Sequence, residues 1–533
     1  MIKQKIIWTV LKLFFYLKRE GFSGAMHRVQ RKFIPEPRYS TWYKKNGVFK
    51  RKGSWNIREI HKLNRNIDII FLEDNISKKT ISKLDKQIYK PRGIYSNMYA
   101  GGGEYILLVQ GNVDFEIDAL YEFYQRIREN PAADIIYCDH DIEYSRPVFK
   151  PDFNYDLLLS YNYIGNVVLI RRKQLDFIRV QQQDKANIYE IIFQLIEIGA
   201  NIDHIPIVLY HDMQECTKEN TIIKGIIRDH LIRMGYNISI SNGIVEGTFR
   251  VRYKLLSEPM VSIIIPNMDH IGDLKKCLNS VIQKQKYKNY EIIIVENNSV
   301  EGKTFEYYKY LLKTFENVRV LHWKKEFNYS TINNYAVKNA KGRYVLLLNN
   351  DVELIGENVL AEMVGVCSRK DVGAVGAKLY YSDRTIQHAG IIVGYGGIAG
   401  HAFLNCDGNI NGYMGRINCC QNYSAVTAAC MLVKKGIYEA VGGMDTSYKV
   451  AFNDVDFCLK IVNKGLRIVY TPFAEAYHYE SKTRGADDNY KKMKRFNQEI
   501  DLFRSKWGKY ISDGDPAYNP NLTLYKWDFS LKK

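Results

Sequence analysis

Continuous apolar runs alternate with amphipathic stretches along the second half of the chain. The runs occupy residues 261–266 (VSIIIP), 291–297 (EIIIVEN), 318–323 (VRVLHW) and 344–351 (YVLLLNND). Runs that are apolar at almost every position are typical of strands buried on both faces, as in a parallel sheet. The stretches between them carry apolar residues at helical spacing. This alternation predicts an α/β domain with an open sheet, in which ligands bind at the carboxyl ends of the strands.

A weaker version of the same pattern fills the first half. Strands are predicted within residues 67–75, 104–114 and 133–141, and residues 104–123 are similar in order to residues 343–363. We therefore expect an internal repeat of one α/β unit. The predicted organisation is a basic amphipathic helical segment (1–50), a first α/β domain (51–255), a second α/β domain (256–510) and a C-terminal tail (511–533).

Basic residues outnumber acidic ones, 76 against 58 in 533 residues, which gives a formal charge of +18. Such a surplus favours anionic partners: phosphates, acidic lipid headgroups or nucleic acid. No helix-turn-helix, zinc-finger spacing or RNP-type aromatic motif is present, so we expect no nucleic-acid partner. The nine cysteines are scattered without metal-ligand spacing, which favours a reducing cytoplasm.

Residues 6–17 (IIWTVLKLFFYL) form an apolar run close to basic residues. The run is too short to span a bilayer, which takes about 20 residues. It has no small-residue cleavage site of the kind that ends a signal peptide. Two interpretations stay open: a helix lying in the plane of an anionic membrane face, or a helix packed on the domain. The first predicts a cytoplasmic protein held peripherally at the inner face of the membrane.

Polar residues close two of the predicted strands. Glu296 follows EIIIV, where a carboxylate could accept a hydrogen bond from a base or a ribose. Asp351 and Asn349 follow YVLLL, where a carboxylate and an amide oxygen could bind a hard divalent cation. The alternative for both sites is a turn and helix-cap cluster, since Asn, Asp and Ser favour such positions.

Two further segments carry candidate chemistry. Asp454 and Asp456 begin a predicted helix, where a carboxylate could act as a general base or simply favour the helix dipole. His478 could complete a metal shell, although a lone His is more often structural. Ser481 and Arg484 follow it and could bind a departing diphosphate.

A glycine-rich segment, residues 387–403 (QHAGIIVGYGGIAGHAF), lies between these motifs. It lacks the strand–turn–helix context of a dinucleotide-binding fingerprint, so a strand and a loop near an acceptor are expected instead. Ser330 is predicted to be the N-cap of the helix over 330–340.

Eight segments, in one order between residues 261 and 485, resemble the family 2 glycosyltransferases, which have the GT-A fold. The resemblance is strongest to bacterial members that build O-antigens, capsules and rhamnose-rich polysaccharides. The segments are VSIIIPN, IIIVENNS, FNYSTINN, YVLLLNNDVE, IQHAGIIVG with GGIAGHAF, AVTAACMLV, AFNDVDFCLKI and HYESKTRG.

The resemblance implies a role for each candidate residue. Asp454 matches the catalytic base of the family's E-D motif, in which Asn453 replaces the usual Glu. Asp351 and Asn349 match the D-x-D element that holds Mg²⁺ or Mn²⁺, and His478 matches a late metal-binding His. The other implied contacts are with the donor nucleotide or its diphosphate (Glu296, Asn298, Asn334, Asn350, Ser481, Arg484) and with the acceptor (His388, Asp456).

The implied reaction is an inverting transfer from a nucleotide-diphosphate sugar to a hydroxyl of a glycan, such as a polyprenyl-diphosphate-linked glycan. The first half resembles a degenerate copy of the same domain. It has VQGNVD (109–114) in place of a metal motif and QDKAN (183–187) in place of a base motif. We expect it to be non-catalytic. The alternative for the whole chain is a non-catalytic glycan-binding or scaffolding protein of a polysaccharide assembly complex.

Overall fold

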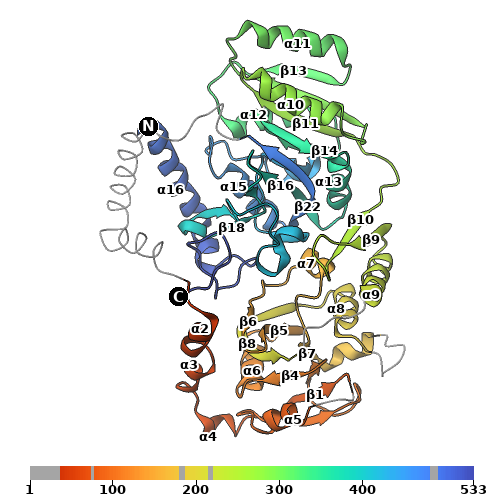
Figure 1. Ribbon diagram of the computed structural model, residues 1–533, viewed down its shortest axis with the longest axis vertical. Coiled ribbons are helices and arrows are strands. Elements are labelled where there is room, and N and C mark those ends of the chain that lie inside the picture. The colour runs from red at the N-terminus through yellow and green to blue at the C-terminus, as the bar shows by residue number, and fades with distance from the viewer. Residues whose placement is uncertain (1–35, 74–76, 179–185, 214–219, 480–489) are drawn as a thin grey trace.

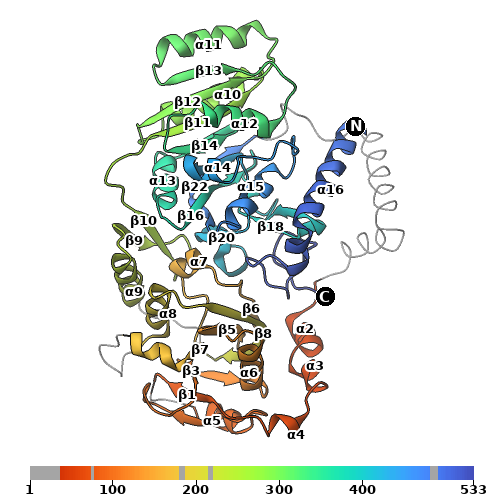
Figure 2. The same ribbon diagram turned by 180° about the vertical axis from the view of Figure 1, so that it is seen from behind.

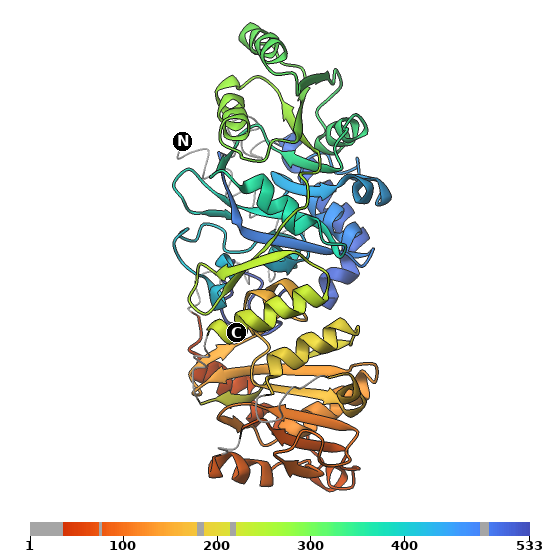
Figure 3. The same ribbon diagram turned by 90° about the vertical axis from the view of Figure 1, so that its right-hand side faces the viewer.

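The computed structural model describes residues 36–73, 77–178, 186–213, 220–479 and 490–533, and they form two mixed sheets with helices packed on them (Figure 1). The two halves of the chain lie end to end along the long axis of the molecule (Figure 2, Figure 3). We use "N-terminal half" for the described residues up to 253 and "C-terminal half" for residues 261–513.

The N-terminal half contains an eight-stranded sheet and a two-stranded hairpin. Its strands are β1 (Ile67–Phe71), β2 (Gly93–Tyr95), β3 (Tyr105–Val109), β4 (Val113–Phe115), β5 (Ile135–Ile142), β6 (Arg146–Val148), β7 (Val167–Arg171), β8 (Ile202–Asp212), β9 (Ile238–Asn242) and β10 (Phe249–Tyr253). Its helices are α2 (Tyr39–Asn46), α3 (Val48–Lys52), α4 (Ile57–Ile60), α5 (Lys78–Asp85), α6 (Ala119–Glu129), α7 (Tyr155–Ser160), α8 (Ile188–Glu197) and α9 (Asn220–Arg233), with the 3₁₀ turn η1 (Arg172–Phe177).

The C-terminal half contains a ten-stranded sheet and the hairpin β18–β19. Its strands are β11 (Val261–Asn267), β12 (Tyr290–Glu296), β13 (Val318–His322), β14 (Tyr344–Leu348), β15 (Val352–Ile355), β16 (Val372–Tyr380), β17 (Ile386–His388), β18 (Ile391–Val393), β19 (Ala399–His401), β20 (Gln421–Tyr423), β21 (Cys430–Lys434) and β22 (Arg467–His478). Its helices are α10 (Ile271–Ile282), α11 (Gly302–Thr314), α12 (Tyr329–Lys338), α13 (Val359–Cys367), α14 (Lys435–Ala440), α15 (Asn453–Val462) and α16 (Tyr490–Asp513), with 3₁₀ turns η3 (Tyr395–Gly397) and η4 (Tyr413–Asn418).

The two large sheets share one topology. The strand order is β2-β1-β3-β7-β5-β8-β4 in the first and β12-β11-β14-β21-β16-β22-β15 in the second, which adds β13 at one edge. The directions agree as well: β3–β7 and β14–β21 are antiparallel, and β5–β8 and β16–β22 are parallel. This match confirms the predicted internal repeat and the α/β class.

Alternate residues of the central strands enter different cores. Ile264 and Ile293 belong to a cluster that includes Ile332 of α12, whereas Ile263 and Ile292 belong to a cluster that includes Leu274 of α10. Successive side chains of a strand point to opposite faces, so both faces of this sheet are covered. That burial explains why the strands are apolar at consecutive positions.

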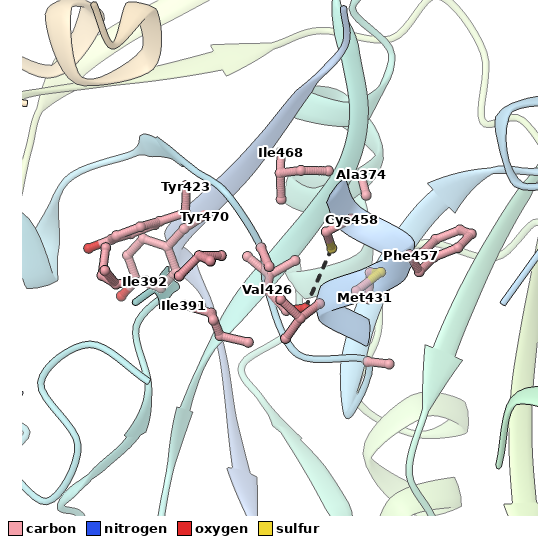
Figure 4. Packing of buried hydrophobic residues seen from close by; sticks show 14 of the residues in the cluster. Ala374, Ile391, Ile392, Tyr423, Val426, Met431, Phe457, Cys458, Ile468 and Tyr470 are labelled. Carbon is pink, nitrogen blue, oxygen red and sulfur yellow. Dashed lines mark hydrogen bonds between the residues drawn. The ribbon is translucent and has the colours of Figure 1, made fainter. Parts of the chain in front are cut away.

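Close packing fixes α15 against the sheet (Figure 4). The thiol of Cys458 lies 3.7 Å from the carbonyl oxygen of Val426, and Phe457 and Met431 complete the same cluster. A Cβ at Gly376 would lie only 2.5 Å from the Cβ of Val426. Glycine at this place in β16 therefore lets the segment before β21 pack directly on the sheet, beneath the start of α15.

The segment that follows α16, residues 514–531, packs on both halves. The amide nitrogen of Asn519 donates to Asp139 Oδ2 and to the carbonyl oxygen of Lys150, both at 2.8 Å. The carboxylate of Asp515 accepts from the backbone N–H of Val393 at 2.7 Å and from the Ser424 hydroxyl at 2.8 Å. The predicted boundary at residue 510 falls inside α16, and the residues beyond it join the two halves.

Candidate active site

The turn between β14 and β15 brings two candidate metal ligands together. β15 pairs antiparallel with β22 so that Val352 lies opposite His478. Asp351, one residue before Val352, therefore has its Oδ1 atom 3.2 Å from His478 Nε2. The backbone N–H of Tyr479 donates to the carbonyl oxygen of Asp351 at 3.0 Å. Both side chains are buried, with exposed fractions of 7% and 5%.

The donor atoms at this turn suit a hard divalent cation. Both atoms are buried, yet among the described residues His478 Nδ1 has no hydrogen-bond partner and Asp351 Oδ1 has only the His478 Nε2 atom 3.2 Å away. A buried polar atom without a partner is unfavourable unless something else satisfies it. The described part of the chain contains no group of three or more His, Cys, Asp or Glu that could hold a metal. The protein would thus supply one carboxylate, one imidazole and the Asn349 amide, leaving other positions for phosphate oxygens and water.

A hydrogen-bonded chain connects this pair to the predicted base. The hydroxyl of Tyr329 lies 3.2 Å from Asn349 Oδ1 and 3.0 Å from the carbonyl oxygen of Ala428. The N–H of Ala428 donates to Asp454 Oδ2 at 3.3 Å. Burial raises the pKa of Tyr329, and the negative charge of Asp454 raises it further. Contacts thus run between Asp454 and the pair Asp351–His478, which come from three separate segments and form one candidate site.

Asp454 lies half-buried in the first turn of α15. Phe452, which precedes this helix, has a left-handed backbone with φ of 60°, a conformation that is uncommon for a bulky residue. Glu499 of α16 holds the preceding loop, because its carboxylate accepts from the N–H groups of Val450 and Ala451 at 2.9 and 3.2 Å. Contacts with α16 thus hold the loop that precedes α15.

Asp456 does not face the site, and the prediction of an acceptor-side role is wrong. Its carboxylate is fully buried, 2.6 Å from the Lys506 ammonium and 2.9 Å from the indole nitrogen of Trp507, both on α16. Residues two apart on an α-helix point in nearly opposite directions, since each residue turns the helix by about 100°. Asp454 and Asp456 are two residues apart in the motif and therefore cannot lie on the same face of the helix.

Glu296 ends β12 with its carboxylate already occupied by protein groups. It accepts from the N–H and hydroxyl of Ser299, both at 2.6 Å, and from the Tyr308 hydroxyl at 2.7 Å. The turn interpretation thus describes what Glu296 does in this structure. Its predicted contact with the nucleotide stays a prediction.

A relay of amides and hydroxyls joins the ends of neighbouring strands. Asn350 donates to Asn267 Oδ1 at 2.7 Å, and Asn267 donates to the Tyr308 hydroxyl at 2.7 Å. Tyr308 in turn donates to Glu296. The buried Asn350 side chain therefore fixes the turn between β14 and β15 relative to the end of β12. Its predicted donor contact, like that of Glu296, stays untested.

The remaining donor-side candidates have structural contacts of their own. Asn298 is exposed, has a φ of 60° and donates to the carbonyl oxygen of Lys325 at 2.9 Å. Asn334 accepts from the Met444 N–H at 2.9 Å and from the Tyr438 hydroxyl at 2.7 Å, and donates to the Met444 carbonyl at 2.8 Å. Asn334 therefore tethers the loop before α15. Ser481 and Arg484 lie outside the described residues.

The predicted N-cap of α12, Ser330, is wrong, and Tyr329 was not among the predicted site residues. The N-cap is Asn328, whose Oδ1 accepts from the Thr331 N–H at 2.9 Å. Ser330 lies within the helix and donates to the carbonyl oxygen of Tyr448 at 2.7 Å. Asn is as good an N-cap as Ser, so the sequence FNYS allowed either frame. With the correct frame, Tyr329 is the first residue of the helix and faces the strand end.

His388 lies behind the site and is fully buried. Its Nε2 accepts from the Thr427 N–H at 3.4 Å, and its Nδ1 lies 3.0 Å from His401 Nδ1. Burial holds the pKa of His388 well below its usual value, and the neighbouring His401 and His478 lower it further. The ring is therefore neutral and supports the segment that carries Ala428. Its predicted acceptor-side role is untested.

The N-terminal half keeps the backbone of this site and replaces its side chains. Asn112 occupies the place of Asp351: its carbonyl accepts from the Met213 N–H at 3.0 Å, as Asp351 accepts from Tyr479. Val113 pairs with Asp212 as Val352 pairs with His478. The second residue of α8 is the fully buried Tyr189, in the place that Asp454 holds in α15.

Asp212 and its neighbours satisfy one another. Asn166 donates to Asp212 Oδ2 at 2.7 Å, and Gln110 accepts from the N–H of Ile188 at 3.3 Å. The hydroxyl of Tyr189 donates to the carbonyl oxygen of Leu158. The substituted site is closed by its own hydrogen bonds.

Within the described residues, no helix has both the length and the apolar character needed to cross a membrane. The amphipathic segment predicted over residues 6–17 lies outside them.

The profile of the family described as Glycosyl transferase family 2 matches residues 262–442. Among curated proteins, the chain is 39% identical over 450 residues to the uncharacterized protein y4gI of Sinorhizobium fredii, covering 80% of this chain and 49% of that protein. It is 33% identical over 442 residues to the O-antigen biosynthesis protein RfbC of Myxococcus xanthus, covering 78% of this chain and 33% of that protein. The chain therefore spans about half, or less, of the length of these relatives.

Among solved structures, the mannosyltransferase PcManGT from Pyrobaculum calidifontis in complex with GDP-Man and Mn²⁺ is 16% identical, with a TM-score of 0.35 over 50% of this chain and 68% of that one. The family match falls on the half whose sheet carries the predicted strand-end motifs. Residues 262–442, within the C-terminal half, belong to glycosyl transferase family 2.

Proposed function

We propose that the C-terminal half is an inverting glycosyltransferase that moves a sugar from a nucleotide-diphosphate donor to a hydroxyl of a glycan. The observation that supports this most directly is the chain of contacts from Asp454 through Ala428 and Tyr329 to Asn349, beside Asp351 and His478. It joins a candidate base to candidate cation ligands across one strand edge, where α/β folds bind nucleotides.

Asp454 is the proposed general base. As the acceptor oxygen forms a bond to the anomeric carbon, the bond from that carbon to the diphosphate oxygen breaks, and its electron pair leaves with the nucleoside diphosphate. Asp454 takes the proton of the attacking hydroxyl. A carboxylate is a weak base for an alcohol at rest, so the transfer becomes favourable only as bond formation acidifies the hydroxyl. The Ala428 N–H donates to Asp454 Oδ2 and thereby orients the Asp454 carboxylate.

Asp351, His478 and Asn349 are the proposed ligands of Mg²⁺ or Mn²⁺. When bound, such a cation neutralises charge that develops on the leaving diphosphate. Arg484 and Ser481, by the family resemblance, would add hydrogen bonds to the same phosphates.

The proposed acceptor is a cell-surface glycan, such as one carried on a lipid diphosphate. The name of the Myxococcus relative, an O-antigen biosynthesis protein, supports this class. The formal charge of +18 suits a phosphorylated donor, an anionic lipid carrier and an anionic membrane face. The N-terminal half is proposed to be non-catalytic, because Asn112, Asp212 and Tyr189 replace the metal and base side chains.

A screen of nucleotide sugars for Mn²⁺-dependent release of nucleoside diphosphate tests this proposal. Asp454→Asn should lower turnover of the donor that the wild-type protein uses by about 10²-fold or more. Glu439→Gln, which removes a carboxylate 59% exposed on the neighbouring helix α14, is the matched control and should leave turnover unchanged. Equal turnover by Asp454→Asn and wild type would refute the assignment of the base.

A further inference from the structure

The side-chain amide of Asn349 can adopt two orientations, and the choice between them has a consequence for Tyr329. The single proton of the Tyr329 hydroxyl faces two acceptors, Ala428 O at 3.0 Å and Asn349 Oδ1 at 3.2 Å. On its other side, Asn349 Nδ2 lies 3.4 Å from His478 Nε2. In this orientation the amide presents a donor, not an acceptor, to the candidate metal ligands.

A half-turn of the amide gives the Tyr329 proton a single acceptor. Asn349 Nδ2 then donates to the Tyr329 oxygen, and Tyr329 donates its proton to Ala428. The amide oxygen takes the position beside His478 Nε2, which also lies 3.2 Å from Asp351 Oδ1. The two ends of an amide are nearly equal in size, so the partners decide which end points where. The amide oxygen and the Asp351 carboxylate oxygen then both lie beside His478 Nε2.

We propose that Tyr329 is a positioning residue that selects the metal-binding orientation of Asn349. Asp, the commoner residue at this place in the family, has two equivalent oxygens and needs no such selection. Asn needs a partner that accepts from its nitrogen, and the Tyr329 oxygen does so only because Ala428 takes the hydroxyl proton. The inference rests on the proposed function, since it assigns these three residues to a divalent cation.

Binding of Mn²⁺ alone, measured from the electron paramagnetic resonance signal of the free ion, tests this without turnover. Tyr329→Phe should weaken binding roughly fivefold, the size of one lost hydrogen bond. Tyr335→Phe, on the same helix, is the matched control and should bind as the wild type does. Tyr335 packs beside Trp323 with ring centroids 5.4 Å apart. Thermal unfolding of each variant reports whether a change in binding follows a change in folding.

The Asn349→Asp background separates orientation from general support. There, Tyr329→Phe should weaken Mn²⁺ binding by less than about twofold, because a carboxylate has no wrong end. An equal loss in both backgrounds would mean that Tyr329 supports the turn in another way, and would overturn the inference. A wild-type protein that binds Mn²⁺, with Tyr329→Phe unchanged, overturns the inference alone. A wild-type protein that binds no Mn²⁺ overturns both it and the metal part of the proposed function.

Discussion

The two halves of the chain have the same strand order and different side chains at the same strand ends. In both, the turn before the short antiparallel strand is closed by one backbone hydrogen bond of 3.0 Å, at Asn112 and at Asp351. In the N-terminal half, the Asn166 amide satisfies Asp212. In the C-terminal half, Asp351 Oδ1 has only the His478 Nε2 atom 3.2 Å away, and His478 Nδ1 has no partner among the described residues. A shared backbone thus places the turn, and the side chains that it carries differ between the halves.

The largest expected effect is at the base. Asp454→Asn should lower turnover by about 10²- to 10⁴-fold, the usual contribution of a general base. The equivalent change in the other half, Tyr189→Phe, removes a buried hydroxyl and should leave turnover within about twofold. Steady-state release of nucleoside diphosphate measures both. A large loss in Tyr189→Phe, with its unfolding temperature preserved, would contradict the non-catalytic assignment of the N-terminal half.

Replacing Asp351 with the residue found at the equivalent turn of the N-terminal half should have the next largest effect. Asp351→Asn gives the C-terminal turn the side chain of Asn112 and removes the only carboxylate among the three proposed ligands. Mn²⁺ binding and turnover should fall on the order of a hundredfold, because a bound cation contributes several kcal/mol to stabilising the leaving group. Asp212→Asn in the other half should change neither. Mn²⁺ binding by Asp351→Asn at wild-type strength would remove Asp351 from the ligand set.

The junction between the halves should respond through stability. Arg369 is fully buried, lies within hydrogen-bond distance of Asp156 in α7 and is 2.7 Å from Asp371. Asp156→Asn leaves part of that buried charge without a partner and should cost about 3 kcal/mol of unfolding free energy. The double variant Asp156→Leu with Arg369→Met removes both charges and should recover most of the loss. Urea unfolding curves measure both, and equal losses in the two variants would contradict the ion-pair explanation.

The smallest expected effect concerns pH. Burial holds the pKa of His388 well below 6.5 in the folded protein. The unfolded chain therefore binds one more proton below about pH 6.5, and stability falls as the pH falls, by up to about 1.4 kcal/mol per pH unit. His388→Gln should reduce this slope between pH 6.5 and 5.5, measured by unfolding at each pH. An unchanged slope would mean that His388 titrates normally.

The sequence was sufficient for the elements that depend on continuous burial. Strands β11, β12 and β14 lie where they were predicted and are buried at almost every position, and the repeat follows from the similarity of residues 104–123 to 343–363. The approach of Asp351 to His478 was also expected, because both lie at strand ends of one sheet.

The wrong predictions concern residues that are close in sequence but point in different directions in the structure. Asp456 followed Asp454 in a motif, but helical geometry turns it toward Lys506 and Trp507. Tyr329 gave no signal, because its role depends on Asn349 and Ala428, which lie 20 and 99 residues away. A motif lists residues along the chain, and the hydrogen bonds that decide their roles come from other segments.

The packing of residues 514–531 has a consequence for how the protein is made. Asp139 is translated early, yet one of its hydrogen-bond partners, Asn519, follows 380 residues later. When the ribosome has released the whole first sheet, it has not yet synthesised Asn519, whose amide donates to Asp139. The last contacts of the N-terminal half should therefore form only after the C-terminal half and residues 514–531 have emerged.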